Sequence, residues 1–230
     1  MTTAPLIALL AGARETPVVA EWLAQTPANS VVIWARGADR VDVGLPERDG
    51  VPQDAAGILD VTHAFDITTR NQAITQAPGA HYARIARAPW VAGAGDQWVH
   101  AETIEEAVRA LPAGARVFAA TGRASLPALA EHDGPVFLRQ LRHHDHPPGH
   151  RNCAYVFGAA PFDPVGEADL LGRLDIDVVL ARNIGGAGSF PKLAAARALG
   201  LPVVLLRQPD VPQGARLHSA AQVADWVAGL

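Results

Sequence analysis

The chain has 230 residues, a formal net charge of −4 and a single cysteine, and 49% of its residues are hydrophobic. Such a chain can bury one large core or two small ones, which excludes a disordered protein. The net negative charge and the absence of a run of basic residues argue against a nucleic-acid binder. Because Cys153 has no partner for a disulfide, we expect a cytoplasmic protein. The apolar stretch 5–12 is far shorter than the roughly 20 residues that span a bilayer, so we expect no membrane contact.

Short apolar runs alternate along the chain with longer stretches of helical period, a pattern typical of βαβ units and parallel sheets. The predicted strands are Leu6–Leu10, Val31–Ala35, Gly57–Val61, Tyr82–Ile85, Arg116–Ala120, Val136–Leu138, Ala154–Phe157, Val178–Ala181 and Val203–Leu206. The predicted helices are Thr16–Ala24, Thr68–Ala77, Ile104–Ala110, Leu126–Glu131, Gly166–Leu174, Pro191–Leu199 and Ala220–Val227. Nine strands are many for one sheet, and a polar turn lies near the midpoint. We therefore predict an α/β fold with two Rossmann-like parallel-sheet lobes, residues 1–112 and 113–230, and a ligand cleft between them.

The first predicted strand runs into Gly12 and Arg14, where a dinucleotide fold places its pyrophosphate on the N-terminus of the next helix. The fingerprint G-x-G-x-x-G is absent, because Gly12 is the only glycine of this turn. One interpretation is a turn that contacts phosphate, with Arg14 supplying the charge. The alternative is an ordinary connection between strand and helix.

Arg36 follows the second predicted strand, at the point where a dinucleotide site meets the adenosine ribose. An acidic residue there favours NAD, whereas an arginine pairs with the 2′-phosphate of NADP. Asp39 lies close enough in sequence to approach a ribose hydroxyl, and Arg36 on a solvated loop is the alternative. We expect Arg36 to select NADPH.

Asp60, Thr62 and His63 lie together where the third predicted strand gives way to a helix. In parallel sheets, ligands bind just outside this end of the strands. The three side chains offer an acid, a hydroxyl and an imidazole, which can relay a proton or hold the amide of a nicotinamide. In the alternative interpretation, Asp60 or Thr62 only caps the following helix.

Two further groups follow strands. Tyr82 and Arg84 share one face of a strand, and Arg87 and Trp90 come soon after; an isolated tryptophan is more often part of the core. The run Thr121, Gly122 and Arg123 ends the fifth predicted strand.

A glycine-rich loop, Gly185-Gly186-Ala187-Gly188, separates the strand Val178–Ala181 from a helix whose first turn carries Lys192, the only lysine of the chain. Such a loop brings backbone amides close to a phosphate or carboxylate. It lacks the G-K-[ST] ending of a Walker loop.

These segments, with the runs 59–65 and 81–90, resemble in matching order the precorrin-6A reductases, NADPH-dependent enzymes of cobalamin biosynthesis. The resemblance implies reduction of a double bond in precorrin-6A, a tetrapyrrole that bears many carboxylates. The expected catalytic residues are Asp60, Thr62 and His63. The expected cofactor-binding residues are Gly12, Arg14, Arg36, Gly185, Gly186, Gly188 and Lys192, with Arg182 and Asn183 matched more loosely. The expected substrate-binding residues are Tyr82, Arg84, Arg87, Thr121, Gly122 and Arg123, and further arginines are available at 139, 142 and 151.

Two other functions remain open from the residues alone: a two-lobed glycosyltransferase-like enzyme, and a non-catalytic NADP-binding sensor. The histidine-rich stretch 142–153 matches no zinc pattern, so we expect no metal. The expected partners are the tetrapyrrole substrate and, transiently, other enzymes of the pathway.

Overall fold

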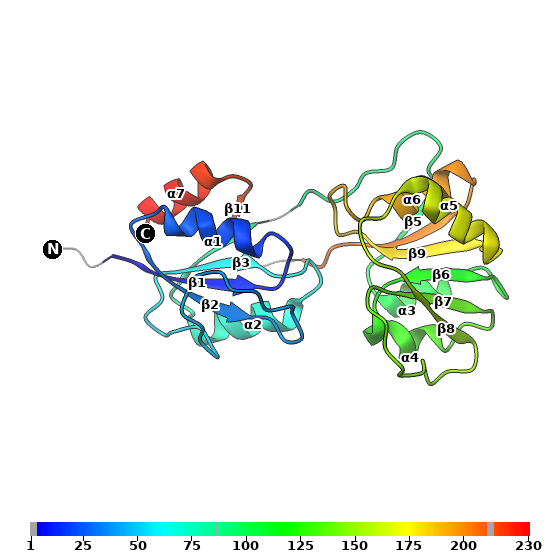
Figure 1. Cartoon of the computed structure of the whole chain (residues 1–230), viewed down its shortest axis with the longest axis horizontal. Coiled ribbons are helices and arrows are strands. Elements are labelled where there is room, and N and C mark those ends of the chain that lie inside the picture. The colour runs from blue at the N-terminus through cyan, green and yellow to red at the C-terminus, as the bar shows by residue number, and fades with distance from the viewer. Residues whose placement is uncertain (1–3, 86, 211–213) are drawn as a thin grey trace. The chain divides into compact units, whose positions relative to one another are not determined.

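The computed structural model describes residues 4–85, 87–210 and 214–230. Contacts within the chain divide it into two compact units (Figure 1). The first unit comprises Met1–Arg87 and Pro209–Leu230, and the second comprises Ala88–Gln208. Each unit has its own sheet, so each is described separately.

The first unit is a parallel sheet with helices on both faces. Its described strands are β1 (Leu6–Ala11), β2 (Asn29–Trp34), β3 (Gly57–Val61), β4 (His81–Ile85) and β11 (Ala215–Leu217). Its described helices are α1 (Thr16–Ala24), α2 (Ile67–Gln76) and α7 (Ala220–Ala228). The strand order is β11-β4-β3-β1-β2, and every pairing within this sheet is parallel. The carboxyl ends of all these strands therefore meet at one edge of the sheet.

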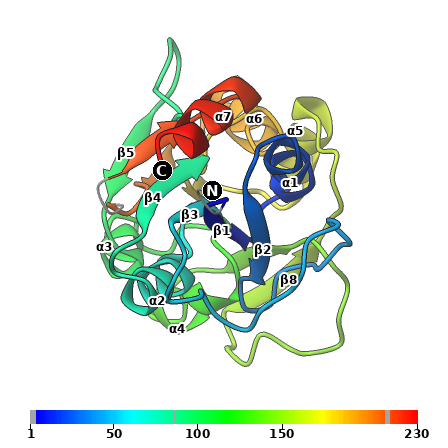
Figure 2. The same cartoon turned by 90° about the vertical axis from the view of Figure 1, so that its left-hand side faces the viewer.

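Residues alternate between the two faces of this sheet, as the period of a strand requires. Leu9 and Leu59 pack on the face covered by α1 and α7, whereas Leu10 and Ile58 pack on the face covered by α2. Figure 2 shows α1 and α7 on one side of the strands and α2 on the other. Polar side chains on the α2 face are consequently placed between the sheet and a helix.

The second unit has the same kind of architecture. Its described strands are β5 (Trp98–Ala101), β6 (Val117–Ala120), β7 (Val136–Gln140), β8 (Cys153–Phe157), β9 (Val178–Arg182) and β10 (Val203–Leu206). Its described helices are α3 (Ile104–Arg109), α4 (Leu126–Leu129), α5 (Pro164–Arg173) and α6 (Pro191–Ala198), with a 3-10 helix at Arg123–Ser125. The strand order is β5-β10-β9-β6-β7-β8, again with parallel pairings. Helices α5 and α6 pack side by side over a core that includes Phe118, Leu171 and Leu193.

The predicted fold class is confirmed: the protein is α/β, with two parallel sheets. All seven predicted helices and all nine predicted strands are present. Half of their ends coincide with the prediction, and the others shift by one or two residues. The strands β5 and β11 were not predicted. Both are short edge strands of four and three residues, so their apolar pattern is weak.

The two units differ from the predicted lobes 1–112 and 113–230. Strand β5 pairs with β10, which places residues 98–101 in the second unit. Strand β11 pairs with β4, and α7 packs against α1, which returns the C-terminal segment to the first unit. At Gly57 an added Cβ would lie 2.6 Å from Cη2 of Trp226, so this segment packs tightly on β3. Within the described residues, no helix is long and apolar enough to cross a membrane.

Candidate active site

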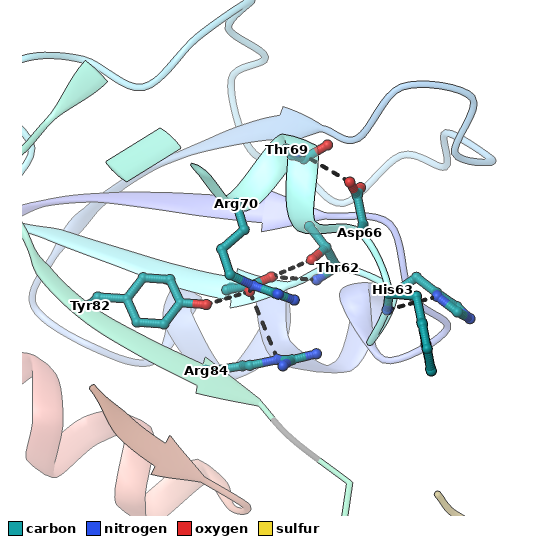
Figure 3. A network of polar contacts seen from close by, with 9 residues as sticks. Thr62, His63, Asp66, Thr69, Arg70, Tyr82 and Arg84 are labelled. Carbon is teal, nitrogen blue, oxygen red and sulfur yellow. Dashed lines mark hydrogen bonds and ion pairs between the residues drawn. The ribbon is translucent and has the colours of Figure 1, made fainter. Parts of the chain in front are cut away.

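A buried carboxylate, Asp60, lies near the end of β3 and bonds side chains from α2 and β4. Figure 3 shows Thr62, Arg70, Tyr82 and Arg84, which meet in this network. Oδ1 of Asp60 accepts hydrogen bonds from the backbone N of Thr62 at 2.8 Å and from the Thr62 hydroxyl at 2.6 Å. Its Oδ2 accepts from Nε of Arg70 at 2.8 Å and from the Tyr82 hydroxyl at 2.5 Å. Asp60 and Arg70 are fully buried. The carboxylate therefore holds three neighbouring side chains and has no surface of its own to offer a ligand.

This network contains more positive than negative charge. Nε of Arg84 lies 3.8 Å from the same Oδ2 of Asp60, so two guanidinium groups share one carboxylate. Burial acts to raise the pKa of Asp60, but the hydrogen bonds from Arg70, Thr62 and Tyr82 outweigh it and hold the pKa below its usual range. Burial, followed by the Asp60 charge, raises the pKa of Tyr82, which remains a neutral donor. Burial and the charge of Arg70 lower the pKa of Arg84.

His63 is exposed, unlike Asp60 and Thr62, the other two residues of the predicted catalytic trio. Its Nδ1 accepts a hydrogen bond from the backbone N of Phe65 at 3.2 Å, which orients the ring at the start of the loop into α2. The cap of α2 is Asp66, whose Oδ1 accepts from the backbone N of Thr69 at 3.0 Å. The alternative that Asp60 or Thr62 caps this helix is therefore wrong. At this strand end the His63 imidazole is therefore exposed, and the Asp60 carboxylate and Thr62 hydroxyl are buried.

A cavity of about 620 Å³ lies at the carboxyl ends of β1 and β2, beside α2. Its lining mixes apolar and polar side chains. The lining residues are Leu10, Ile33, Trp34, Arg36, Arg40, Asp49, Val51, Asp66, Thr68, Thr69, Gln72, Ala73 and Gln76. Its volume and mixed lining are typical of small-molecule sites, and Arg36 lines it shortly after the end of β2.

The turn between β1 and α1 is tight. The backbone N of Gly12 donates to the Thr16 hydroxyl at 3.2 Å, and a Cβ at Gly12 would lie 3.0 Å from that of Ala35. Arg14 is exposed on the same turn. Glu15 occupies the N-cap of α1 and pairs with Arg87, so one of the expected substrate arginines is already engaged within the first unit.

In the second unit, Trp90 braces the glycine-rich loop. Its indole Nε1 donates to the carbonyl of Gly186 at 2.8 Å. The Asn183 side chain bonds both the backbone N and the carbonyl of Trp90, at 2.8 and 2.9 Å. Gly185 and Gly186 have φ of +71° and +75°, which L side chains rarely adopt. Trp90 is therefore half-buried against the loop and also lines an apolar cavity of about 360 Å³ there, with Phe190 among its other walls.

Lys192 lies in the first turn of α6, directly after this loop. Its Nζ donates to the Ser189 carbonyl and lies 5.7 Å from the centroid of the Trp90 ring. Burial lowers its pKa to about 8, although the charge of Glu167 opposes the shift. The positive end of a helix is an unfavourable place for a cation, so an ammonium group here is suited to an anionic ligand.

The end of β6 lies beside that of β9. Thr121 is buried, and its hydroxyl lies 2.6 Å from that of Ser125. Gly122 has φ of +80°, and a Cβ there would lie 3.6 Å from Nη1 of Arg182. Arg123 is exposed. Of this predicted trio, only Arg123 presents a charged group at the surface.

The structure thus divides the predicted site residues between the two units. The first unit holds Gly12, Arg14, Arg36, Asp60, Thr62, His63, Tyr82, Arg84 and Arg87. The second unit holds Thr121, Gly122, Arg123, Gly185, Gly186, Gly188 and Lys192. Sequence reasoning missed Arg70, whose position on a helix gave no sign of burial, and it passed over the bracing role of Trp90 and Asn183.

Parallel α/β units with polar groups and cavities at the carboxyl ends of their strands are typical of proteins that bind nucleotides. The precorrin-6x reductase family CbiJ/CobK matches residues 51–228 of the chain. A precorrin-6A reductase of Rhodobacter capsulatus is 35% identical over 239 residues, which covers 96% of this chain and 94% of that protein. One of Rhodococcus erythropolis is 32% identical over 247 residues, covering 97% and 94%. A solved structure, CobK precorrin-6A reductase, superposes with a TM-score of 0.81 at 32% identity and covers 98% of this chain and 96% of its own.

The chain therefore belongs to the precorrin-6x reductase family CbiJ/CobK. Members are oxidoreductases that act on a carbon–carbon double bond, and a reductase of this kind uses a nicotinamide cofactor. The cavity beside Arg36 is lined by apolar side chains together with amide, hydroxyl, carboxylate and guanidinium groups, a mixture that suits part of such a cofactor.

Proposed function

We propose that the protein reduces precorrin-6A to precorrin-6B with NADPH as the hydride donor, in cobalamin biosynthesis. The observation that carries the proposal is the match to precorrin-6A reductases along 96% of the chain. The cofactor supplies a hydride, so the protein has to bind the two ligands, orient them and manage one proton. A cytoplasmic location and transient contact with other enzymes of the pathway stay predictions.

For the cofactor, we assign the adenosine end to the cavity at β1 and β2. Arg36 lines this cavity and carries a charge that suits a 2′-phosphate. Gly12 and Arg14 on the first turn of the same unit are the groups available for the phosphates. A contribution of the loop glycines and Lys192 to cofactor binding stays a prediction. These assignments rest on the position of each residue at a strand end and on its charge.

For the substrate, the guanidinium groups of Arg84, Arg87 and Arg123 suit the carboxylates of a tetrapyrrole. Tyr82 is committed to Asp60, and Thr121 and Gly122 shape the turn that carries Arg123. We therefore assign Tyr82, Thr121 and Gly122 to positioning, and Arg84 and Arg123 to direct contact. Contact of Arg87 with substrate stays a prediction, because Arg87 pairs with Glu15.

For the reaction itself, we propose that His63 is the group that meets the ligands at the end of β3. Asp60 and Thr62 are buried and bonded to each other, so their role is to hold the strand end in place. An exposed imidazole can hold a cofactor amide or pass a proton through water. This assignment divides the predicted catalytic trio into one contacting residue and two positioning residues.

The test of the function is a tetrapyrrole-dependent loss of NADPH absorbance with the purified protein under anaerobic conditions. We expect oxidation of NADPH only when precorrin-6A is present, and much weaker use of NADH. Binding of NADPH without any oxidation would support a sensor instead, and binding of a nucleotide sugar in place of NADPH would support a glycosyltransferase-like enzyme.

The cofactor preference has its own test in the Arg36→Ala variant. Loss of a charge-assisted contact at an exposed side chain should weaken NADPH binding by about 1–2 kcal/mol and leave NADH nearly unchanged. Dissociation constants for both cofactors, measured by fluorescence titration, check this. If NADPH and NADH binding weaken equally, Arg36 does not contact the 2′-phosphate, and Arg14 becomes the next candidate.

A further inference from the structure

The α2 face of the first unit holds an excess of buried positive charge beside β4. Arg70 is fully buried, and Arg84 is 5% exposed. The only carboxylate paired with either of them, among the described residues, is Asp60. The Tyr82 hydroxyl that also faces Asp60 is neutral. The cluster of Asp60, Arg70, Tyr82 and Arg84 therefore carries one uncompensated positive charge.

Several donors of this cluster also have no acceptor. Nη1 and Nη2 of Arg70 and Nε of Arg84 are buried and make no hydrogen bond within the described structure. Buried charged donors without partners are costly, and such groups are normally paired in a stable protein. Figure 3 shows Arg84 reaching from its strand toward the network that Arg70 and Tyr82 also enter. An anion beside Arg84 would compensate the charge.

A third arginine lies next to this cluster. Arg216 is the register partner of Arg84 in the parallel pair of β11 and β4, so the two side chains project from the same face of the sheet. Arg216 is exposed, and no described carboxylate forms an ion pair with it. Its charge adds to those that lower the pKa of Arg84. The two arginines thus lie at one register position on neighbouring strands, and the only described carboxylate that pairs with either is Asp60, which Arg70 shares.

We propose that Arg84 and Arg216 form a binding site for a carboxylate of the substrate, with Asp60 and Arg70 holding Arg84 in position. The identification of the anion as a carboxylate of the tetrapyrrole rests on the proposed function. Paired guanidinium groups match the two oxygens of a carboxylate. The site requires the C-terminal segment, because β11 supplies one of its two arginines.

The test uses the full chain with Arg216→Gln, and Arg216→Lys as the variant that retains the charge. Arg48→Gln is the matched control, since Arg48 is an exposed arginine of the same unit outside the cavity lining and the proposed sites. The probes are uroporphyrin, a stable porphyrin rich in carboxylates, and NADPH. In Arg216→Gln we expect the dissociation constant for uroporphyrin and the KM for precorrin-6A to rise about fivefold to tenfold, as for one partly exposed charge-assisted contact. NADPH affinity should stay within about twofold of the parent, and Arg216→Lys should recover part of the loss.

Unchanged uroporphyrin affinity in Arg216→Gln would overturn the proposal. Loss of NADPH affinity in its place would also overturn it, because the anion would then be a phosphate of the cofactor. The parent protein separates this proposal from the proposed function. If the parent does not oxidise NADPH with precorrin-6A, the proposed function fails, while the uroporphyrin comparison still decides whether the two arginines bind a carboxylate.

Discussion

At the scale of single residues, His63 and Asp60 are neighbours in sequence with opposite surroundings. His63 is exposed, whereas Asp60 is buried and accepts hydrogen bonds from three side chains. An exposed imidazole can contact a ligand. A buried carboxylate that accepts hydrogen bonds within the protein instead stabilises the fold. Replacing each residue should therefore change a different measured quantity.

We expect His63→Ala to lower turnover about 10- to 100-fold while the cofactor dissociation constant changes little, because the group acts in the transition state. Single-turnover rates with NADPH measure this directly. As a contrast, Asp60→Asn leaves Arg70 and Arg84 without their counter-charge and should cost about 3–5 kcal/mol of unfolding free energy in urea. A His63→Ala protein that turns over like the parent would show that the imidazole is not needed.

Lys192 allows a prediction about pH. Its pKa is lowered to about 8, so the ammonium group is charged below that pH and neutral above it. If Lys192 contacts an anionic part of the cofactor, NADPH affinity should fall as the pH rises through about 8. Lys192→Arg should remove this dependence, because an arginine stays charged. Titrations with NADPH across that pH range check this prediction. If the affinity of the parent depends on pH in the same way as that of Lys192→Arg, Lys192 does not contact the cofactor.

The residue scale also shows which parts of the site could be predicted. The positions of Arg36 and His63 just after strands were predictable from the local pattern, and such strand ends are where ligands bind in parallel sheets. Their contacts with ligand stay predictions. Arg70 was not, because its role depends on Asp60 ten residues away and on burial under a helix. Arg216 was not, because β11 is only three residues long and its partner strand lies in a distant part of the chain.

At the scale of elements, the loop between β9 and α6 contains glycines in two kinds of backbone conformation. Gly185 and Gly186 have positive φ, whereas Gly188 does not, and a Cβ at Gly188 meets no atom within 4 Å. The sequence pattern alone does not distinguish the three glycines. In the structure, the positive φ of Gly185 and Gly186 favours glycine at these two positions, whereas Gly188 borders open space.

We expect Gly188→Ala to fold like the parent and to lose cofactor affinity, since its methyl group would occupy the space that a ligand needs. Gly186→Ala should lower the unfolding free energy by about 1–2 kcal/mol, because alanine is strained at positive φ. Urea unfolding and NADPH titration of both variants measure the two effects. If Gly188→Ala binds NADPH as well as the parent does, the loop does not approach the cofactor at this glycine.

At the scale of the whole molecule, the second unit is continuous in sequence and the first is not. We expect a fragment of residues 88–208 to fold alone, because it contains its complete sheet and core. A fragment of residues 1–87 lacks β11 and α7, which leaves the apolar face around Val19 and Leu23 without part of its cover. It should unfold without a cooperative transition. Circular dichroism and urea unfolding of both fragments test this, and a cooperative 1–87 fragment would contradict it.

The sequence by itself determined the α/β class, the positions of all seven helices, and the polar residues at the strand ends. These features follow from local pattern, since the periods of strands and helices and the signals that end them lie within a few neighbouring residues. Only the tertiary structure decided which unit each segment joins, which polar residues are buried, and which loops are braced. Strand β11 joins β4 across more than half the chain, and Trp90 bonds the carbonyl of Gly186, 96 residues away. Burial and charge pairing depend on such distant contacts, and no local pattern records them.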